Sequence, residues 1–166
     1  MFNLDLAAVA ERSDGVRARL AGRRVAVVQE WISARAGSEK VFEAFARPEL
    51  LARWWGPNGF TNTFEAFEFE PGGAWKFVMH GPDGSHHANE SIFLQIEAPE
   101  RLVIQHVSKP HFVLTITLHE NDDSTRIDWV GIFDDADVAD RLRPMAEPAN
   151  EQNLDRLAAV LAATRR

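Results

Sequence analysis

Residues 101–133 read RLVIQHVSKPHFVLTITLHENDDSTRIDWVGIF, and apolar side chains alternate with polar ones along most of this stretch. Alternation with a period of two predicts β-strands, and turn residues at 108–110 and 121–124 divide the stretch into three of them. Connections this short join only antiparallel neighbours. The stretch therefore predicts three antiparallel strands whose inward side chains are Leu102, Ile104, His106, Phe112, Leu114, Ile116, Ile127, Trp129, Gly131 and Phe133.

The strand pattern continues toward the N-terminus. Turn residues at 71–73, 81–84 and 98–100 separate further strands from residue 60 onward, and the β-branched segment 24–34 predicts the first strand of the chain. The pattern as a whole predicts an antiparallel sheet of about seven strands.

The hairpin around Pro82 and Asp83 sets the register of the strand that follows it. With these two residues at the tip, we expect Trp75 to lie opposite Glu90 and Met79 opposite His86. Glu90 would then face the apolar side of the sheet, together with Ile92, Leu94 and Ile96.

Helical spacing appears on both sides of these strands. Ser38 predicts the N-cap of a short helix, and Pro48 predicts the start of a second one. After Phe133 the spacing is again helical, but Pro144 and Pro148 interrupt it, so we expect a continuous helix only over residues 149–164. The fold class is α+β: a curved antiparallel sheet, with two short helices after its first strand, wraps around a long C-terminal helix. Residues 1–23 would form a helical extension, and residues 24–166 the main domain.

Composition excludes several classes of function. The chain has 166 residues, enough for one domain, and a net charge of −7 without a basic tract, which argues against nucleic acid as a partner. No apolar run reaches the length that spans a bilayer, so we expect a soluble protein with no membrane span. Because the chain lacks cysteine, disulfides are impossible and the cytoplasm is the expected location. The sequence is compatible with a homodimer.

The apolar face predicts a pocket for a small hydrophobic molecule. Eleven Phe and five Trp with no Tyr supply ring surface with few hydroxyl groups. The residues that we expect to contact the ligand are Trp55, Trp75, Phe77, Met79, Ile104, Phe112, Leu114 and Trp129.

Glu90 and His106 are the two ionisable residues that the expected register leaves on this apolar face. As diagonal neighbours on adjacent strands they would lie within reach of each other. The pair could satisfy its own hydrogen bonds, orient the polar end of a ligand, or act as general acid and base. Three histidines lie in one hairpin, but His86 and His87 point to opposite faces, so we expect neither a metal site nor a cofactor.

Several motifs resemble a known superfamily. They are residues 41–45 (VFEAF), 48–57 (PELLARWWGP), 71–75 (PGGAW), 79–84 (MHGPDG) and 99–102 (PERL). Together they resemble the helix-grip superfamily of START-like lipid-transfer and polyketide cyclase proteins (SRPBCC), in the branch similar to the C-terminal domain of the activator of heat-shock protein 90 ATPase. The resemblance implies a helix-grip fold and a ligand-binding domain. It does not choose among carriers, sequestering proteins and enzymes, because one fold serves many functions.

Three functions compete at this point. The first is binding of a small hydrophobic ligand between the sheet and the C-terminal helix. The alternative is an enzyme, a cyclase, dehydratase or hydrolase, that uses Glu90 and His106 as its acid–base pair. The third is a protein-interaction domain that uses the outer face of the sheet or the N-terminal helices.

Overall fold

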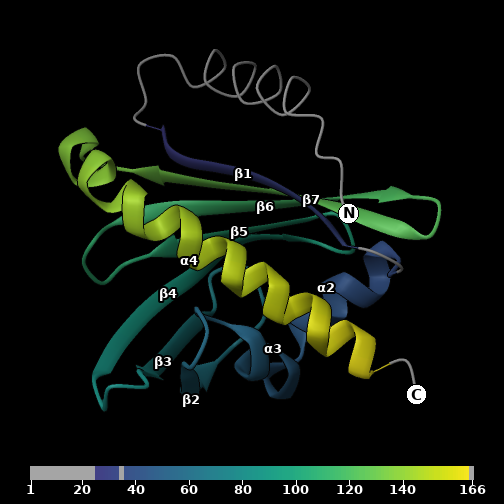
Figure 1. The fold of residues 1–166 in the computed structure, drawn as a ribbon, viewed down its shortest axis with the longest axis horizontal. Helices are drawn as coiled ribbons and strands as arrows, with labels where there is room; N and C mark the ends of the chain where they lie inside the picture. The colour runs from purple at the N-terminus through teal and green to yellow at the C-terminus, as the bar shows by residue number, and fades with distance from the viewer. Residues whose placement is uncertain (1–24, 34–35, 165–166) are drawn as a thin grey trace.

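The computed structural model describes residues 25–33 and 36–164, and the side chains from residue 36 onward. Within these ranges seven strands form one antiparallel sheet in the order β1-β7-β6-β5-β4-β3-β2 (Figure 1). The elements in chain order are β1 (Val25–Ser33), α2 (Ser38–Ala46), α3 (Pro48–Trp54), β2 (Thr61–Phe67), β3 (Ala74–His80), β4 (His86–Glu97), β5 (Arg101–His106), β6 (Phe112–Asn121), β7 (Ser124–Phe133) and α4 (Ala136–Ala163).

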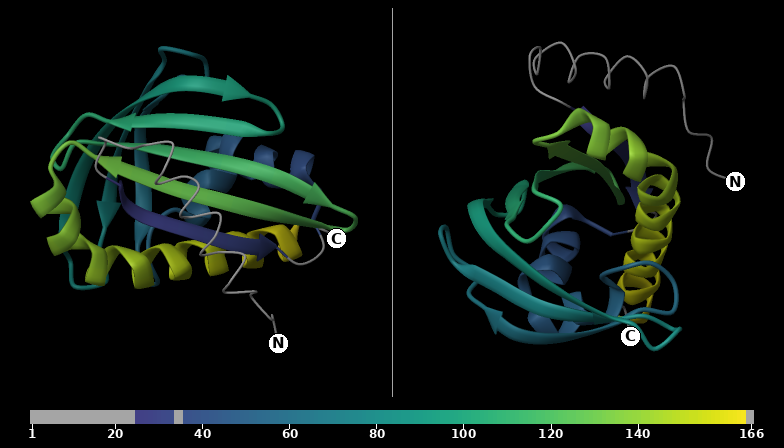
Figure 2. Two further views of the ribbon diagram at one scale, coloured as in Figure 1. Left: turned by 90° about the horizontal axis from the view of Figure 1, so that it is seen from above. Right: turned by 90° about the vertical axis from the view of Figure 1, so that its left-hand side faces the viewer.

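The expected α+β helix-grip architecture is confirmed. The sheet curves, and α4 runs along its open side with α2 and α3 at one end (Figure 2). The predicted helical extension at residues 1–23 lies outside the described residues. Among the described helices, none combines the length and the apolar character that crossing a bilayer requires.

The register of β5, β6 and β7 agrees with the sequence pattern. Ile104 lies opposite Leu114, and Ile116 opposite Trp129. Most side chains of this inward set are buried, with Ile127 fully so, and they form one core with α2, α3 and α4. The apolar alternation predicted this register correctly because the short turns pair each strand with the next strand along the chain.

The expected register of the β3–β4 hairpin is wrong by one residue. Trp75 lies opposite Ser91 instead of Glu90, and Met79 lies opposite His87 instead of His86. The turn contains one residue more on its β4 side, because Gly81 donates to the carbonyl of Ser85 and Gly84 adopts a φ of 86°. Only glycine adopts this conformation readily. The additional turn residue shifts the register of β4 against β3 by one position.

The slip reverses the faces of the first part of β4. His87, Asn89, Ser91 and Phe93 are cross-strand partners of inward residues, whereas Glu90 and Ile92 face outward. A bulge between Phe93 and Gln95 then restores the expected register, so that Ile96 lies opposite Leu102. The outward placement of Leu94, which is 46% exposed, corrects the expectation that it faces inward.

Two helix boundaries also differ from the sequence prediction. Gly37, not Ser38, occupies the N-cap of α2, and the Ser38 amide donates instead to Glu120 Oε1 at 3.3 Å. Helix α4 is continuous from residue 136 although it contains Pro144 and Pro148. Both prolines are exposed, so water can satisfy the carbonyls that they leave without a donor.

Candidate functional site

Two chambers are lined by the inner face of the sheet and share five lining residues, and α4 lines one of them. The helix chamber, about 320 Å³, is lined by Trp55, Gly56, Pro57, Met79, Pro110, Phe112, Leu114, Trp129, Gly131, Phe133, Leu142, Met145, Ala146, Ala149, Asn150 and Asn153. The strand chamber, about 510 Å³, is lined by Trp55, Trp75, Phe77, Met79, His87, Ala88, Asn89, Ser91, Ile104, His106, Lys109, Pro110, Phe112 and Leu114. Because Trp55, Met79, Pro110, Phe112 and Leu114 belong to both walls, the two chambers adjoin each other, and we refer to them together as the cavity.

All eight residues that the sequence analysis expects to contact a ligand lie in these walls. Trp129 lines the helix chamber, and Trp75, Phe77 and Ile104 line the strand chamber. The other four line both. Ligand contact itself stays a prediction, but the alternation of side chains along β3, β5, β6 and β7 brings these residues together.

Trp55 lies where the two chambers meet. Its ring centroid is 5.0 Å from that of Trp75 and 5.6 Å from that of Trp129, so three indoles from α3's end, β3 and β7 form a continuous aromatic surface. Aromatic pairs at such distances add about 0.5–1.5 kcal/mol each beyond the burial of their area.

A set of polar contacts from α4 holds the segment that carries Trp55. The Arg156 guanidinium donates to the carbonyls of five residues, at 2.8–3.3 Å; these are Arg53, Trp55, Gly56, Pro57 and Phe60. Asn153 Oδ1 accepts from the Gly56 amide at 3.1 Å. We call this segment, residues 53–60, the Trp55 loop. Partial burial lowers the pKa of Arg156, but a guanidinium keeps its charge at neutral pH.

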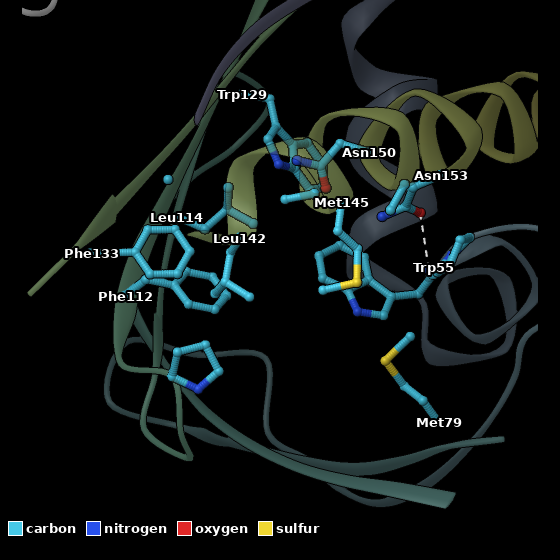
Figure 3. A pocket seen from close by; sticks show the side chains of 16 residues that line it. Trp55, Met79, Phe112, Leu114, Trp129, Phe133, Leu142, Met145, Asn150 and Asn153 are labelled. Atoms are coloured by element: carbon cyan, nitrogen blue, oxygen red, sulfur yellow. Dashed lines mark hydrogen bonds between the residues drawn. The ribbon is translucent and has the colours of Figure 1, made fainter. Parts of the chain in front are cut away.

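Helix α4 supplies the apolar roof of the helix chamber. Figure 3 shows Leu142 and Met145 projecting into the space between Phe112 on one side and Trp55 on the other. Met145 is 68% exposed, which places it at the mouth. The sequence analysis missed these helix residues because it expected the helix to begin only after Pro148.

His106 is the buried ionisable group of the strand chamber. It is 9% exposed, and its ring stacks on Phe112 with centroids 4.6 Å apart. Nδ1 lies 2.8 Å from the carbonyl of Pro110, and Nε2 lies 2.9 Å from Asn89 Oδ1 and 3.3 Å from Ser108 Oγ. Because a carbonyl only accepts, Nδ1 carries a proton.

Burial lowers the pKa of His106, against the raising effect of its hydrogen bonds with Pro110 and Ser108, and the nearby His111 lowers it further. The lowered pKa favours the neutral ring at neutral pH, in which Nε2 can accept from the Ser108 hydroxyl, whereas the 2.9 Å contact with Asn89 Oδ1 is a hydrogen bond only when Nε2 carries a proton. A second proton at Nε2 would instead be donated to Asn89 Oδ1. A charged group placed beside His106 would therefore change the protonation state of its imidazole.

The expected pair of Glu90 and His106 is wrong in its geometry. Glu90 lies on the outer face of the sheet, opposite Lys76, and its Oε1 is 3.4 Å from Lys76 Nζ. The side chain is exposed, and the residue is not part of either chamber wall. The one-residue slip of the β3–β4 hairpin explains the error, since it exchanges Glu90 for Asn89 on the inner face.

The histidines of the β3–β4 hairpin are divided between the two faces, as expected for adjacent residues. His80 and His86 contact each other on the outer face, with their Nδ1 atoms 2.7 Å apart, whereas His87 lines the strand chamber. Across the described part of the chain, no group of three or more His, Asp and Glu side chains is arranged to hold a metal ion.

Comparison with known proteins agrees with the architecture. Residues 35–162 match the sequence family described as Activator of Hsp90 ATPase homolog 1-like protein. No curated protein matches the chain. A solution structure of a protein from Arthrobacter aurescens is similar, with 25% identity, a TM-score of 0.75, and coverage of 83% of this chain and 87% of that one.

Two further solved structures share the fold at lower identity. A crystal structure of a protein from Chromobacterium violaceum has 24% identity and a TM-score of 0.72, and the match covers 81% of this chain and 96% of that one. An AHSA1-like protein from Aeromonas hydrophila has 18% identity and a TM-score of 0.66, with coverage of 83% and 94%. The family match, over residues 35–162, includes every residue that lines the two chambers.

Proposed function

We propose that this chain, which belongs to the Activator of Hsp90 ATPase homolog 1-like family, binds one small apolar molecule in the cavity between the sheet and α4. The observation that carries the proposal is the lining of that cavity. Rings and aliphatic side chains form a continuous wall across both chambers, and ionisable side chains occur only in the strand chamber. A concave, mostly apolar site with a few convergent polar groups is typical of small-molecule binding.

The cavity has room for a ligand of modest size. Each chamber exceeds by far the roughly 150 Å³ of an apolar cavity that accepts benzene. Binding of an apolar ligand would add contacts to the aromatic wall and remove its apolar surface from water.

The positions of Glu90 and His106 do not support the enzyme alternative. It requires a carboxylate beside His106 in the cavity, and Glu90 lies on the other face of the sheet. His106 can exchange a proton, but none of the described carboxylates lines either chamber to serve as its partner. Binding is the function that the geometry favours. The proposal places the protein in the cytoplasm, since the chain has no cysteine, and leaves a homodimer compatible with binding.

A cavity-filling substitution tests this proposal. Gly131 lines the helix chamber, and a Cβ there would meet only the Phe133 ring, at 3.7 Å. We expect wild-type protein to enhance the fluorescence of N-phenyl-1-naphthylamine, a neutral apolar probe, and Gly131→Leu to bind it at least about tenfold more weakly at a temperature well below the melting temperature of the variant.

Leu94→Ala is the matched control, because Leu94 is an apolar residue on the outer face. This variant should bind the probe as the wild type does. Absence of probe binding by the wild type, or equal loss in both variants, would overturn the proposal. Native mass spectrometry of freshly purified protein would show any molecule that accompanies the chain.

A further inference from the structure

We infer that the ligand is an amphipathic monocarboxylate whose acidic group lies in the strand chamber and whose apolar body extends into the helix chamber. This inference rests on the proposed function and adds the chemical class of the ligand. Three observations carry it: the sign of the charges in the cavity, an excess of hydrogen-bond donors, and the contrast between the two chambers.

None of the ionisable side chains that line the strand chamber is acidic. The sequence holds 25 acidic residues and a net charge of −7, yet none of the described Asp or Glu side chains lines either chamber. Lys109, His87 and His106 all line the strand chamber. A cationic ligand would find no counter-charge there, whereas an anion would meet an ammonium group and two imidazoles.

Donors without acceptors point to the same class of ligand. Trp75 is 1% exposed, and its Nε1–H has no hydrogen-bond partner within the described part of the chain. An indole nitrogen can only donate, and a buried donor left unsatisfied costs about 1–3 kcal/mol. Lys109, which is exposed to solvent, lines the same chamber and forms no ion pair among the described residues. A ligand oxygen would supply the acceptor that the Trp75 indole lacks and could pair with the Lys109 ammonium group.

His106 adds a group that can change its charge to suit the ligand. Its Nδ1 proton is committed to the Pro110 carbonyl, which fixes the ring and leaves Nε2 on the side of Asn89. A neighbouring anion favours the doubly protonated ring, and Asn89 Oδ1 stands ready to accept the added Nε2–H. The Asn89 side chain also lines the chamber, so both groups border the space that the carboxylate would occupy.

The lining of the helix chamber favours an apolar part of the ligand. It contains no ionisable side chain, and Asn150 and Asn153 are its only polar side chains. Asn153 is already engaged with the Gly56 amide. The end of the ligand in this chamber must therefore be apolar. A phosphate dianion fits less well, because Lys109 is the single permanent cation in the cavity wall.

An isosteric pair of probes tests the class of ligand. 2-Naphthoate and 2-naphthamide have nearly the same shape and differ in charge. We expect the carboxylate to displace N-phenyl-1-naphthylamine from the wild type about tenfold more effectively than the amide, the factor that one charge-assisted hydrogen bond adds over a neutral one. Lys109→Gln should reduce this preference several-fold and leave displacement by the amide unchanged.

Lys76→Gln is the matched control, since it removes the same charge from the outer face of the sheet, where Lys76 pairs with Glu90. Trp75→Phe, which removes the unpartnered donor and keeps the ring, should also lower the preference. Equal displacement by both probes, or a preference that Lys109→Gln and Trp75→Phe leave unchanged, would overturn the inference while the proposed function stands. Failure of the wild type to bind N-phenyl-1-naphthylamine at all would overturn both.

Discussion

His106 combines burial with three polar neighbours from two parts of the chain. The carbonyl of Pro110 holds Nδ1, while Asn89 and Ser108 lie on the side of Nε2. This arrangement holds the orientation of the imidazole ring but allows both its neutral and its protonated state. Under the proposed function, these neighbours would set the protonation of the imidazole that a ligand meets in the strand chamber.

The pH dependence of binding follows from this arrangement. Because burial lowers the pKa of His106, the free protein holds the ring neutral, and a bound carboxylate would raise that pKa again. Proton uptake then accompanies binding, so the affinity for 2-naphthoate should rise as the pH falls from about 8 to about 6, a range in which a carboxylic acid stays ionised. Displacement titrations at several pH values measure this dependence.

Other titratable groups lie near His106 as well. His87 of β4, and Lys109 and His111 of the β5–β6 connection, are the other titratable groups near His106, and none is acidic. His106→Gln should remove most of the pH dependence, and 2-naphthamide should show none in the wild type. An affinity for 2-naphthoate that stays flat over this range would contradict the prediction.

Glu90 should matter little to binding. The carboxylate is exposed on the outer face and pairs there with Lys76, a contact of the kind that adds at most about 1 kcal/mol to stability. Glu90→Gln should therefore leave the affinity for 2-naphthoate within about twofold of the wild type. Isothermal titration calorimetry on this variant and on His106→Gln would compare the two residues directly, and a large loss in Glu90→Gln would refute the placement.

Among the elements, α4 has two tasks that belong to different parts of the helix. Its first half roofs the helix chamber, and its second half holds the Trp55 loop through Asn153 and Arg156. The side chain of Asp135 caps the helix by accepting from the amides of Asp137 and Val138. The acidic residues just after Phe133 thus serve the start of the helix, as their position in the sequence indicates.

Removal of the Arg156 contacts should loosen the Trp55 loop. Lysine keeps the charge but cannot reach five carbonyls with one ammonium group. We expect Arg156→Lys to lower the free energy of unfolding by about 2 kcal/mol, in the range for hydrogen bonds to charged groups, and to weaken probe binding. Urea denaturation measures the first effect. Arg53→Lys, an exposed arginine in the same loop, should change neither quantity.

The sequence predicted the elements better than it predicted their register. Apolar alternation was enough for β5, β6 and β7, and it brought Phe112, Leu114 and Trp129 into one wall. It failed at the β3–β4 hairpin, because the conformation of Gly84 depends on the turn and not on the hydrophobic pattern. The candidate site therefore contains the expected aromatic residues but Asn89 and Ser91 in place of Glu90.

At the scale of the molecule, the sheet and α4 depend on one core. Leu157 of α4 is fully buried and belongs to the cluster that joins the helix to the strands. Leu157→Ala should lower the free energy of unfolding by about 2–5 kcal/mol, as large-to-small substitutions in a core do. Asp155→Ala, two residues earlier on the exposed side, should cost less than about 0.5 kcal/mol. Chemical denaturation of both variants checks the prediction.

The contacts of Arg156 have a consequence for how this protein could change its ligand. All five acceptors are main-chain oxygens, so the guanidinium recognises the path of the Trp55 loop and not the identity of its side chains. Position 55 can therefore vary while the loop keeps its attachment to α4. The scaffold separates the support of the loop from its selectivity, which makes residue 55 a natural starting point for evolving or engineering new specificities.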